Sequence, residues 1–157
     1  MSELSTRLDR WLYRGGRPNR LARLMVRFWA GVFARGWIMR DRVATLEVTG
    51  RRSGRPVSLP VVIADHDGDR YLVSMLGEKA NWVGNVRAAD CRAVLRHGRR
   101  ETVRLVEVET GARAPVLRRY LSVAPGARPH IPVDQHAPLP EFERIADRFP
   151  GFRITAS

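Results

Sequence analysis

The chain has 157 residues, of which 44% are hydrophobic, and its 28 basic and 16 acidic side chains give a net charge of +12. This length and apolar content are typical of one packed domain spanning residues 1–157, and they exclude wholesale disorder. The absence of an apolar run of 18 residues excludes a membrane-spanning helix, and a single cysteine, Cys91, excludes an internal disulfide. The polar first ten residues lack the apolar stretch of a signal peptide, so a cytoplasmic location is expected.

The positive charge is concentrated in the first part of the chain. Residues 1–60 hold 13 basic and 4 acidic side chains, and all the basic residues of the chain except Lys79 are arginines. A cationic surface of this kind suits phosphate, carboxylate, nucleic acid or anionic lipid.

The apolar spacing predicts two helices before residue 41, over 4–14 and 18–36. The second helix is amphipathic, with arginines opposite its apolar stripe. The favoured interpretation is a helix packed on the rest of the domain. An alternative is contact with an anionic membrane at the inner face, through residues 18–36; contact with a partner protein is a third.

From residue 41 to 157 short strands dominate, which favours an α+β split β-barrel of six or seven mostly antiparallel strands. Strands are expected at 43–49, 57–64, 71–75, 92–96, 101–108 and 152–155, and short helices at 80–88, 112–121 and 141–148. Residues 124–140 contain five prolines and are expected to form an extended loop.

The stretch from Gly50 to Pro56 joins two of these strands. Its two glycines permit backbone conformations that expose N–H groups, Ser53 adds a hydroxyl, and three arginines add planar donors that match phosphate or carboxylate oxygens. The loop is therefore a candidate anion-binding site. A solvated hairpin loop without a ligand explains the same residues equally well.

The stretch from Ser74 to Val86 passes from a strand end into a helix. Free N–H groups at a helix start bind anions, and Lys79 would add a charge there. Trp82 and Asn85 lie three residues apart, so they share a helix face that could meet a flat ring. In the alternative interpretation Trp82 belongs to the core and Asn85 to the surface.

These two stretches together resemble the deazaflavin (F420)-dependent nitroreductase and quinone reductase family. The resemblance covers residues 43–86 and rests on Thr49-Gly50-Arg51-Arg52-Ser53-Gly54, on Pro60, on Asp67-Gly68-Asp69-Arg70 and on Asn81-Trp82-x-x-Asn85-Val86. The family has the split β-barrel fold of flavin-binding pyridoxamine oxidases. Its coenzyme is an 8-hydroxy-5-deazaflavin with a phospholactyl tail that carries several glutamates.

The resemblance implies a set of coenzyme contacts. Arg51, Arg52, Ser53 and Gly54 would bind the phosphate and the acidic tail, and the strand of Pro60 would line the ring. The ring and its ribityl chain would be surrounded by Ser74, Met75, Leu76, Gly77, Lys79, Trp82, Asn85 and Val86.

The implied reaction is hydride transfer from reduced F420 to a quinone-like, nitroaromatic or unsaturated small molecule. Candidate proton donors for the product are Ser74, Tyr120 and His130. Members active on quinones carry a tyrosine where this chain has Val83, and tyrosines near the C-terminus where residues 121–157 have none. The sequence therefore does not identify the molecule that accepts the hydride.

Several rivals remain beside this hypothesis. The same barrel could bind FMN or haem, or could carry the coenzyme without catalysis, and a homodimer is an open alternative to a monomer. A nucleic-acid-binding module fits the arginines, but no known motif of that class is present, so no nucleic acid is expected. No metal is expected, because the histidines and Cys91 lack zinc spacing and the Asp65–Asp69 turn lacks the final glutamate of a calcium loop.

Overall fold

The fold is taken from a computed structural model that describes residues 42–157. The helices expected at 4–14 and 18–36, and the membrane contact proposed for 18–36, lie outside the described residues and stay predictions. Within the described part, no helix is long and apolar enough to cross a membrane.

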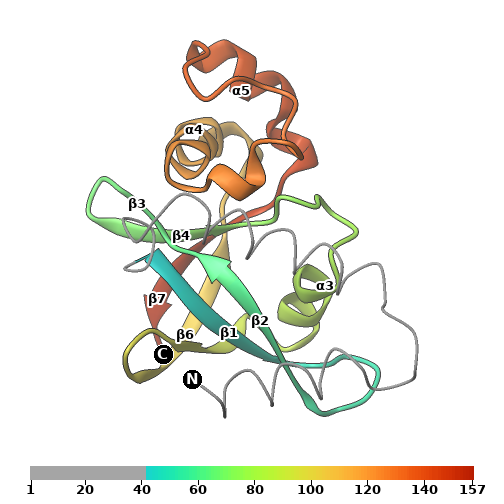
Figure 1. Ribbon diagram of the computed structural model, residues 1–157. Helices are drawn as coiled ribbons and strands as arrows, with labels where there is room; N and C mark the ends of the chain where they lie inside the picture. The colour runs from blue at the N-terminus through green and yellow to red at the C-terminus, as the bar shows by residue number, and fades with distance from the viewer. Residues whose placement is uncertain (1–41) are drawn as a thin grey trace.

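The described chain forms a curled sheet of seven strands (Figure 1). The strands are β1 Val43–Thr49, β2 Pro56–Val62, β3 Ala64–His66, β4 Asp69–Val73, β5 Arg92–Arg96, β6 Arg100–Glu107 and β7 Gly151–Ala156. They lie in the order β2-β1-β5-β6-β7-β4-β3, and each neighbouring pair is antiparallel. The predicted α+β split β-barrel with six or seven antiparallel strands is confirmed.

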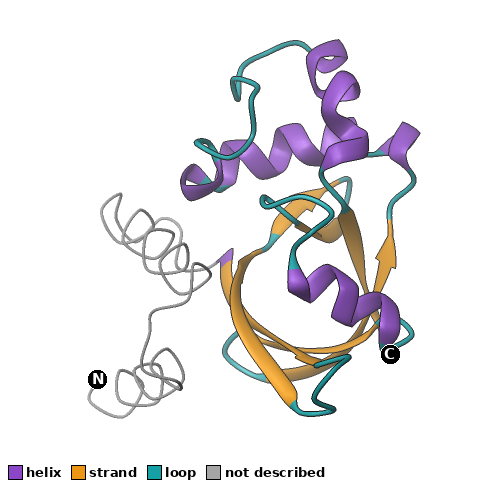
Figure 2. Ribbon diagram, turned by 90° about the vertical axis from the view of Figure 1, so that its right-hand side faces the viewer, coloured by secondary structure: helices purple, strands orange, loops and turns teal. Residues whose placement is uncertain are grey.

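The expectation of one strand over 57–64 is wrong, because the chain changes position in the sheet at Ile63. β2 pairs with β1 at one edge, whereas β3 pairs with β4 at the other edge. The Ile63 N–H still donates to the Arg42 carbonyl at 2.7 Å, one residue beyond the Val62–Val43 pair, and the chain then passes to β4 at Ala64. This crossing brings the two edges of the sheet together, and Figure 2 looks into the resulting ring of strands with a helix in front of it.

The sheet separates two apolar cores. Alternate residues of the strands, such as Leu46, Leu95, Leu105 and Phe152, fill the barrel and are fully buried. On its other face, Val62 and the helices α4 Ala114–Val123 and α5 Leu139–Ile145 form a second core. The helix α3 Asn81–Ala88 packs on the barrel side. Full burial of a large aliphatic side chain contributes about 1.5–3 kcal/mol, so both cores hold these helices against the sheet.

The proline-rich segment 124–140 contains no helix or strand over 128–138, as its composition predicts, but both of its ends are helical. It contains the 3-10 turn η3 Pro125–Ala127, and α5 begins within it at Leu139. Ala127 and Ile131 are buried in the second core, and the His130 and Ile131 N–H groups both donate to the Ala127 carbonyl. Apolar residues between the prolines therefore fold the segment onto the helices.

Asp65 of β3 connects the sheet to α4 and to the residue before β1. Its carboxylate accepts hydrogen bonds from Arg42 and from Arg119, whose Nη2 lies at 3.0 Å. These two bonds lower the pKa of Asp65 to about 2. The ion pairs therefore persist until the pH falls well below neutrality.

Candidate functional site

The β1–β2 connection is a tight loop closed by its own backbone. The Gly50 N–H donates to the Arg55 carbonyl at 2.8 Å, and the Gly54 N–H donates to the Gly50 carbonyl at 2.9 Å. Gly54 has a φ of +69°, which L side chains rarely adopt. A Cβ at Gly50 would lie 2.8 Å from Ser53 Oγ, so this glycine lets the loop fold back on itself.

Arg51 joins this loop to α3. Its backbone N–H and its Nη1 both donate to Asn85 Oδ1, at 3.1 and 2.8 Å, and Nη1 also donates to the Asn81 carbonyl at 3.1 Å. Asn85 is only 5% exposed, so the interpretation that placed it on the surface is wrong. The two stretches that carry the family resemblance are thus in direct contact. We call this set of three hydrogen bonds the Arg51–Asn85 clasp.

The clasp passes close to Gly84, which the sequence analysis did not single out. A Cβ at this position would lie 3.0 Å from Arg51 Cζ and 3.1 Å from its Nη1. Glycine inside a helix costs about 1 kcal/mol relative to alanine, so its presence in the middle of α3 signals a close approach by another group. That signal was available in the sequence, although the approaching residue was not.

The clasp leaves one side of the loop rich in hydrogen-bond donors. Arg52, Ser53 and Arg55 are exposed, and among residues 42–157 nothing accepts a hydrogen bond from the backbone N–H groups of Arg52 and Ser53. Ser53 Oγ accepts from the Arg55 N–H at 3.2 Å, which leaves its own hydrogen free to donate. In the same described part, the buried amide nitrogen of Asn85 also lacks an acceptor. Such a donor set fits an anion such as a phosphate or carboxylate.

The turn after β4 is held by Ser74. This serine is 1% exposed, and its hydroxyl donates to the Gly77 carbonyl at 2.8 Å. Gly77 has a φ of +83°, and a Cβ there would lie 3.0 Å from the Arg148 carbonyl. Met75 packs on the second core and Leu76 on the barrel core, so this turn lies at the junction of the two. Lys79, the one basic residue of this turn, is exposed.

The remaining candidate coenzyme residues differ in how accessible their side chains are. Trp82 is half-buried, and its ring centroid lies 5.3 Å from that of the fully buried Phe152. Val86 is enclosed in the barrel core, so its side chain supports α3 from within. Pro60 is half-buried on the edge strand β2, opposite Thr45 of β1. An edge strand tolerates a proline because its missing N–H faces away from the ladder.

The other two proton-donor candidates lie apart from the clasp in the chain and in the fold. Tyr120 of α4 is 3% exposed within the second core, and burial raises the pKa of its hydroxyl. His130 is half-buried in the segment that follows η3. Across the described residues, no hydrogen bond joins Ser74, Tyr120 and His130 to one another. The same part of the chain contains no group of three His, Cys, Asp or Glu residues that could hold a metal ion.

Similar structures share the fold at low sequence identity. The protein Atu2129 from Agrobacterium tumefaciens, of unknown function, is 15% identical with a TM-score of 0.55; the match covers 75% of this chain and 51% of that one. The chain therefore spans about half of that protein's length. Rv2991 from Mycobacterium tuberculosis is 19% identical (TM-score 0.50; 82% and 78% covered), and a NimC/NimA family protein from Clostridium acetobutylicum is 13% identical (TM-score 0.51; 82% and 84% covered).

A search of curated proteins finds no match. The family model described as F420H(2)-dependent quinone reductase matches residues 19–130, which include the β1–β2 loop, the turn after β4 and the whole of α3. The match covers more than half of the chain and contains both partners of the Arg51–Asn85 clasp. The chain therefore belongs to the F420H(2)-dependent quinone reductase family.

Proposed function

We propose that this protein reduces a small quinone-like, nitroaromatic or unsaturated acceptor with hydride taken from reduced F420. The observation that carries the proposal is the donor-rich β1–β2 loop, which the Arg51–Asn85 clasp holds against α3 in a chain of the F420H(2)-dependent quinone reductase family. The quinone acceptor follows the description of that family, and its identity is part of the proposal.

The donors of the loop suit the acidic part of this coenzyme. We assign its phosphate and glutamate tail to the guanidinium groups of Arg52 and Arg55, to the Arg52 and Ser53 N–H groups and to the Ser53 hydroxyl. Arginine binds such oxygens through two parallel N–H donors, which gives both affinity and orientation. The amide nitrogen of Asn85 is a further donor for a polar atom of the coenzyme, because its oxygen is already held by Arg51.

Around the ring we propose Pro60, the turn from Ser74 to Gly77, Lys79 and Trp82, as the family resemblance implies. Bound F420 would supply the hydride from its reduced ring. The protein's contribution is to hold coenzyme and acceptor at reacting distance, roughly 3–3.5 Å, and to keep water out. The half-buried Trp82 and the turn after β4 suit such a position, because Trp82 packs on Phe152 and the Ser74 hydroxyl holds the turn.

A proton must also reach the product. The Ser74 hydroxyl already donates to the Gly77 carbonyl, and Tyr120 is enclosed in the second core with a raised pKa. We therefore propose that solvent supplies this proton, since His130, the third candidate, lies apart from the clasp. If His130 donates instead, His130→Gln should slow turnover; unchanged turnover would assign the proton to solvent.

The proposal is tested by titrating the full chain with purified F420 and, separately, with FMN in a calorimeter. Saturable binding of F420 is expected, followed by oxidation of reduced F420 when menadione or a nitroaromatic is added. Binding of FMN without binding of F420 would refute the coenzyme assignment. Binding of F420 without turnover of any acceptor would identify a carrier.

Variants of the loop separate two roles of arginine. Arg52→Ala should weaken F420 binding by about tenfold, most for long glutamate tails, and Arg52→Lys should restore part of it because charge is retained. Arg51→Lys should be nearly as harmful as Arg51→Ala, since lysine cannot reproduce the clasp. Arg118→Ala, at an exposed arginine of α4, is the matched control and should bind normally. If the four variants at Arg51 and Arg52 bind F420 as tightly as Arg118→Ala does, the anion-binding role is contradicted.

A further inference from the structure

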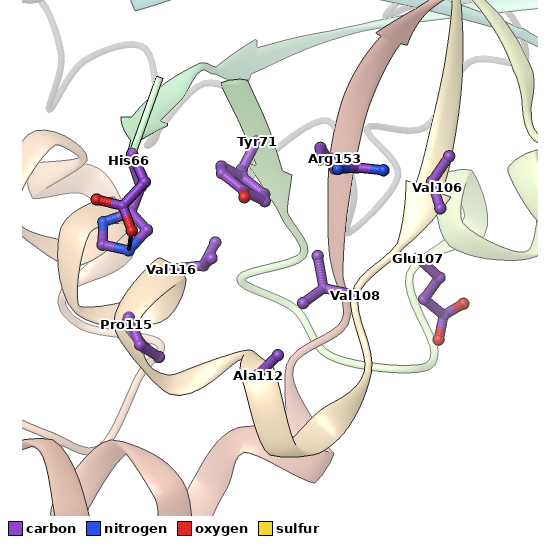
Figure 3. A pocket seen from close by; sticks show the side chains of 10 residues that line it. His66, Tyr71, Val106, Glu107, Val108, Ala112, Pro115, Val116 and Arg153 are labelled. Carbon is purple, nitrogen blue, oxygen red and sulfur yellow. Dashed lines mark ion pairs between the residues drawn. The ribbon is translucent and has the colours of Figure 1, made fainter. Parts of the chain in front are cut away.

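A second candidate binding site lies on the outer face of the sheet, where β4, β7 and β6 pass beside the start of α4. It is a pocket of about 460 Å³, and Figure 3 shows its lining side chains. Pockets of roughly 300–1,000 Å³ accommodate small organic ligands. None of the residues proposed for the coenzyme lines this pocket, so its role does not depend on the proposed function.

Two hydrogen-bond donors of the pocket have no partner among the described residues 42–157. Tyr71 of β4 and Arg153 of β7 are directly opposite in the antiparallel register, and both line the pocket. Within residues 42–157, neither the Tyr71 hydroxyl nor the Arg153 guanidinium makes a hydrogen bond or an ion pair. Burial raises the pKa of Tyr71, so its hydroxyl keeps its hydrogen at neutral pH. Both groups can therefore donate to the same acceptor.

Each of the two carboxylates that line the pocket has a basic residue as its neighbour. Glu107 accepts hydrogen bonds from Arg87 Nε and Nη2 at 2.8 and 2.9 Å. Asp67 lies 3.3 Å from His66 Nε2 and forms an ion pair when this imidazole is protonated (Figure 3). The charges of Asp67 and Asp69 also act on the Tyr71 hydroxyl. Among residues 42–157, neither acid lies within ion-pair distance of Arg153, so in the described part of the chain this guanidinium is available to an anionic group of a ligand.

The walls of the pocket are apolar. Val106 of β6 is directly opposite Arg153 of β7 in the antiparallel register. At 39% exposure it is the most exposed large hydrophobic residue in the described part of the chain. Val108, directly after β6, and Pro115 and Val116 of α4 face the same space (Figure 3). Apolar side chains on opposite sides of a pocket suit the body of an organic molecule better than a free inorganic anion.

We propose that this pocket binds a small aromatic carboxylate, with its carboxylate on Arg153 and Tyr71 and its ring between Val106 and Val116. The guanidinium supplies two parallel donors for the carboxylate, and the phenol supplies a third. The valines remove the ring from water, which stabilises the bound state in proportion to the apolar area covered. The pocket thus recognises one charge and one flat apolar body together.

The experiment uses the full-length protein and 2-naphthoate as the probe, measured by calorimetry at low salt. Saturable binding is expected, and the uncharged 2-naphthamide should bind at least about tenfold more weakly. Arg153→Gln should lose at least about tenfold in naphthoate affinity, and Tyr71→Phe should lose several-fold because only a hydroxyl is removed. Arg100→Gln, at an exposed arginine six residues from Val106 along β6, is the control and should bind as the unmodified protein does.

Several results would overturn the proposal. These are no saturable binding of naphthoate, an affinity that neither Arg153→Gln nor Tyr71→Phe changes, or an equal loss in Arg100→Gln. Displacement of naphthoate by F420 would show that naphthoate binds at the coenzyme site and not in this pocket, whether or not the proposed reductase function holds. A dimer in sedimentation that Val106→Glu dissociates would instead make this face an interface between two copies of the chain.

Discussion

The Arg51–Asn85 clasp can be tested by replacing Asn85 with leucine, a side chain of similar size that accepts no hydrogen bond. The change leaves two Arg51 donors without their shared acceptor, the backbone N–H at 3.1 Å and Nη1 at 2.8 Å. A bond from a charged donor is worth about 1.5–3 kcal/mol and one from a neutral donor about 0.5–1.5 kcal/mol. Because Arg51 is exposed and its donors can turn to water, we expect a loss of about 2–3 kcal/mol in the free energy of unfolding.

Urea unfolding followed by circular dichroism measures this loss as a lower midpoint at an unchanged slope. The stronger test is a double-mutant cycle with Arg51→Met, which keeps the aliphatic part of the side chain over Gly84. A coupling energy of about 1–2 kcal/mol between Arg51→Met and Asn85→Leu is expected. The matched control is the cycle of Asn85→Leu with Arg52→Met, which should be additive because Arg52 makes no hydrogen bond within residues 42–157. Additivity in both cycles, to within about 0.3–0.5 kcal/mol, would refute the clasp.

Two further changes test the close approach at α3 and the ion pairs at β3. Gly84→Ala should lower the free energy of unfolding by about 1 kcal/mol or more despite the better helix propensity of alanine, because its Cβ would lie 3.0 Å from Arg51 Cζ. Gly111→Ala, where a Cβ meets open space, is the control and should not lower it. Equal thermal midpoints for the two variants would contradict this account. Asp65→Asn should lower the melting temperature at pH 7. Since the folded pKa of about 2 lies below the unfolded value, this difference should shrink as the pH falls from about 4 towards 2; a difference that stays constant over this range would contradict the account.

Most strands could be predicted because one of their faces is buried. In β1, Ala44, Leu46 and Val48 alternate with more exposed residues, and the expected bounds 43–49 match the structure. The bounds 92–96 of β5 match for the same reason. A period of two leaves little freedom in such a strand, because a shift by one residue would expose its whole apolar set.

The crossing at Ile63 could not be predicted from the pattern. Val61 and Ile63 face the barrel core, whereas Val62 and Ala64 face the second core. A strand buried on both faces is apolar throughout, so nothing in its sequence marks the residue at which the chain passes to the other edge of the sheet. The burial of the proline-rich segment 124–140 could not be predicted for a related reason, since it depends on α4 and α5.

The sequence by itself determined the family, the antiparallel barrel and the two segments that meet at the proposed coenzyme site, because glycines, arginines and alternating apolar residues restrict the chain locally. Only the tertiary structure decided what each arginine does there. Arg51 and Arg52 are neighbours with the same charge, yet Arg51 is held by Asn85 and Asn81 while Arg52 is exposed. Their roles differ because a hydrogen bond depends on which acceptor the fold brings within about 3 Å, and in this protein that acceptor lies 34 residues further along the chain.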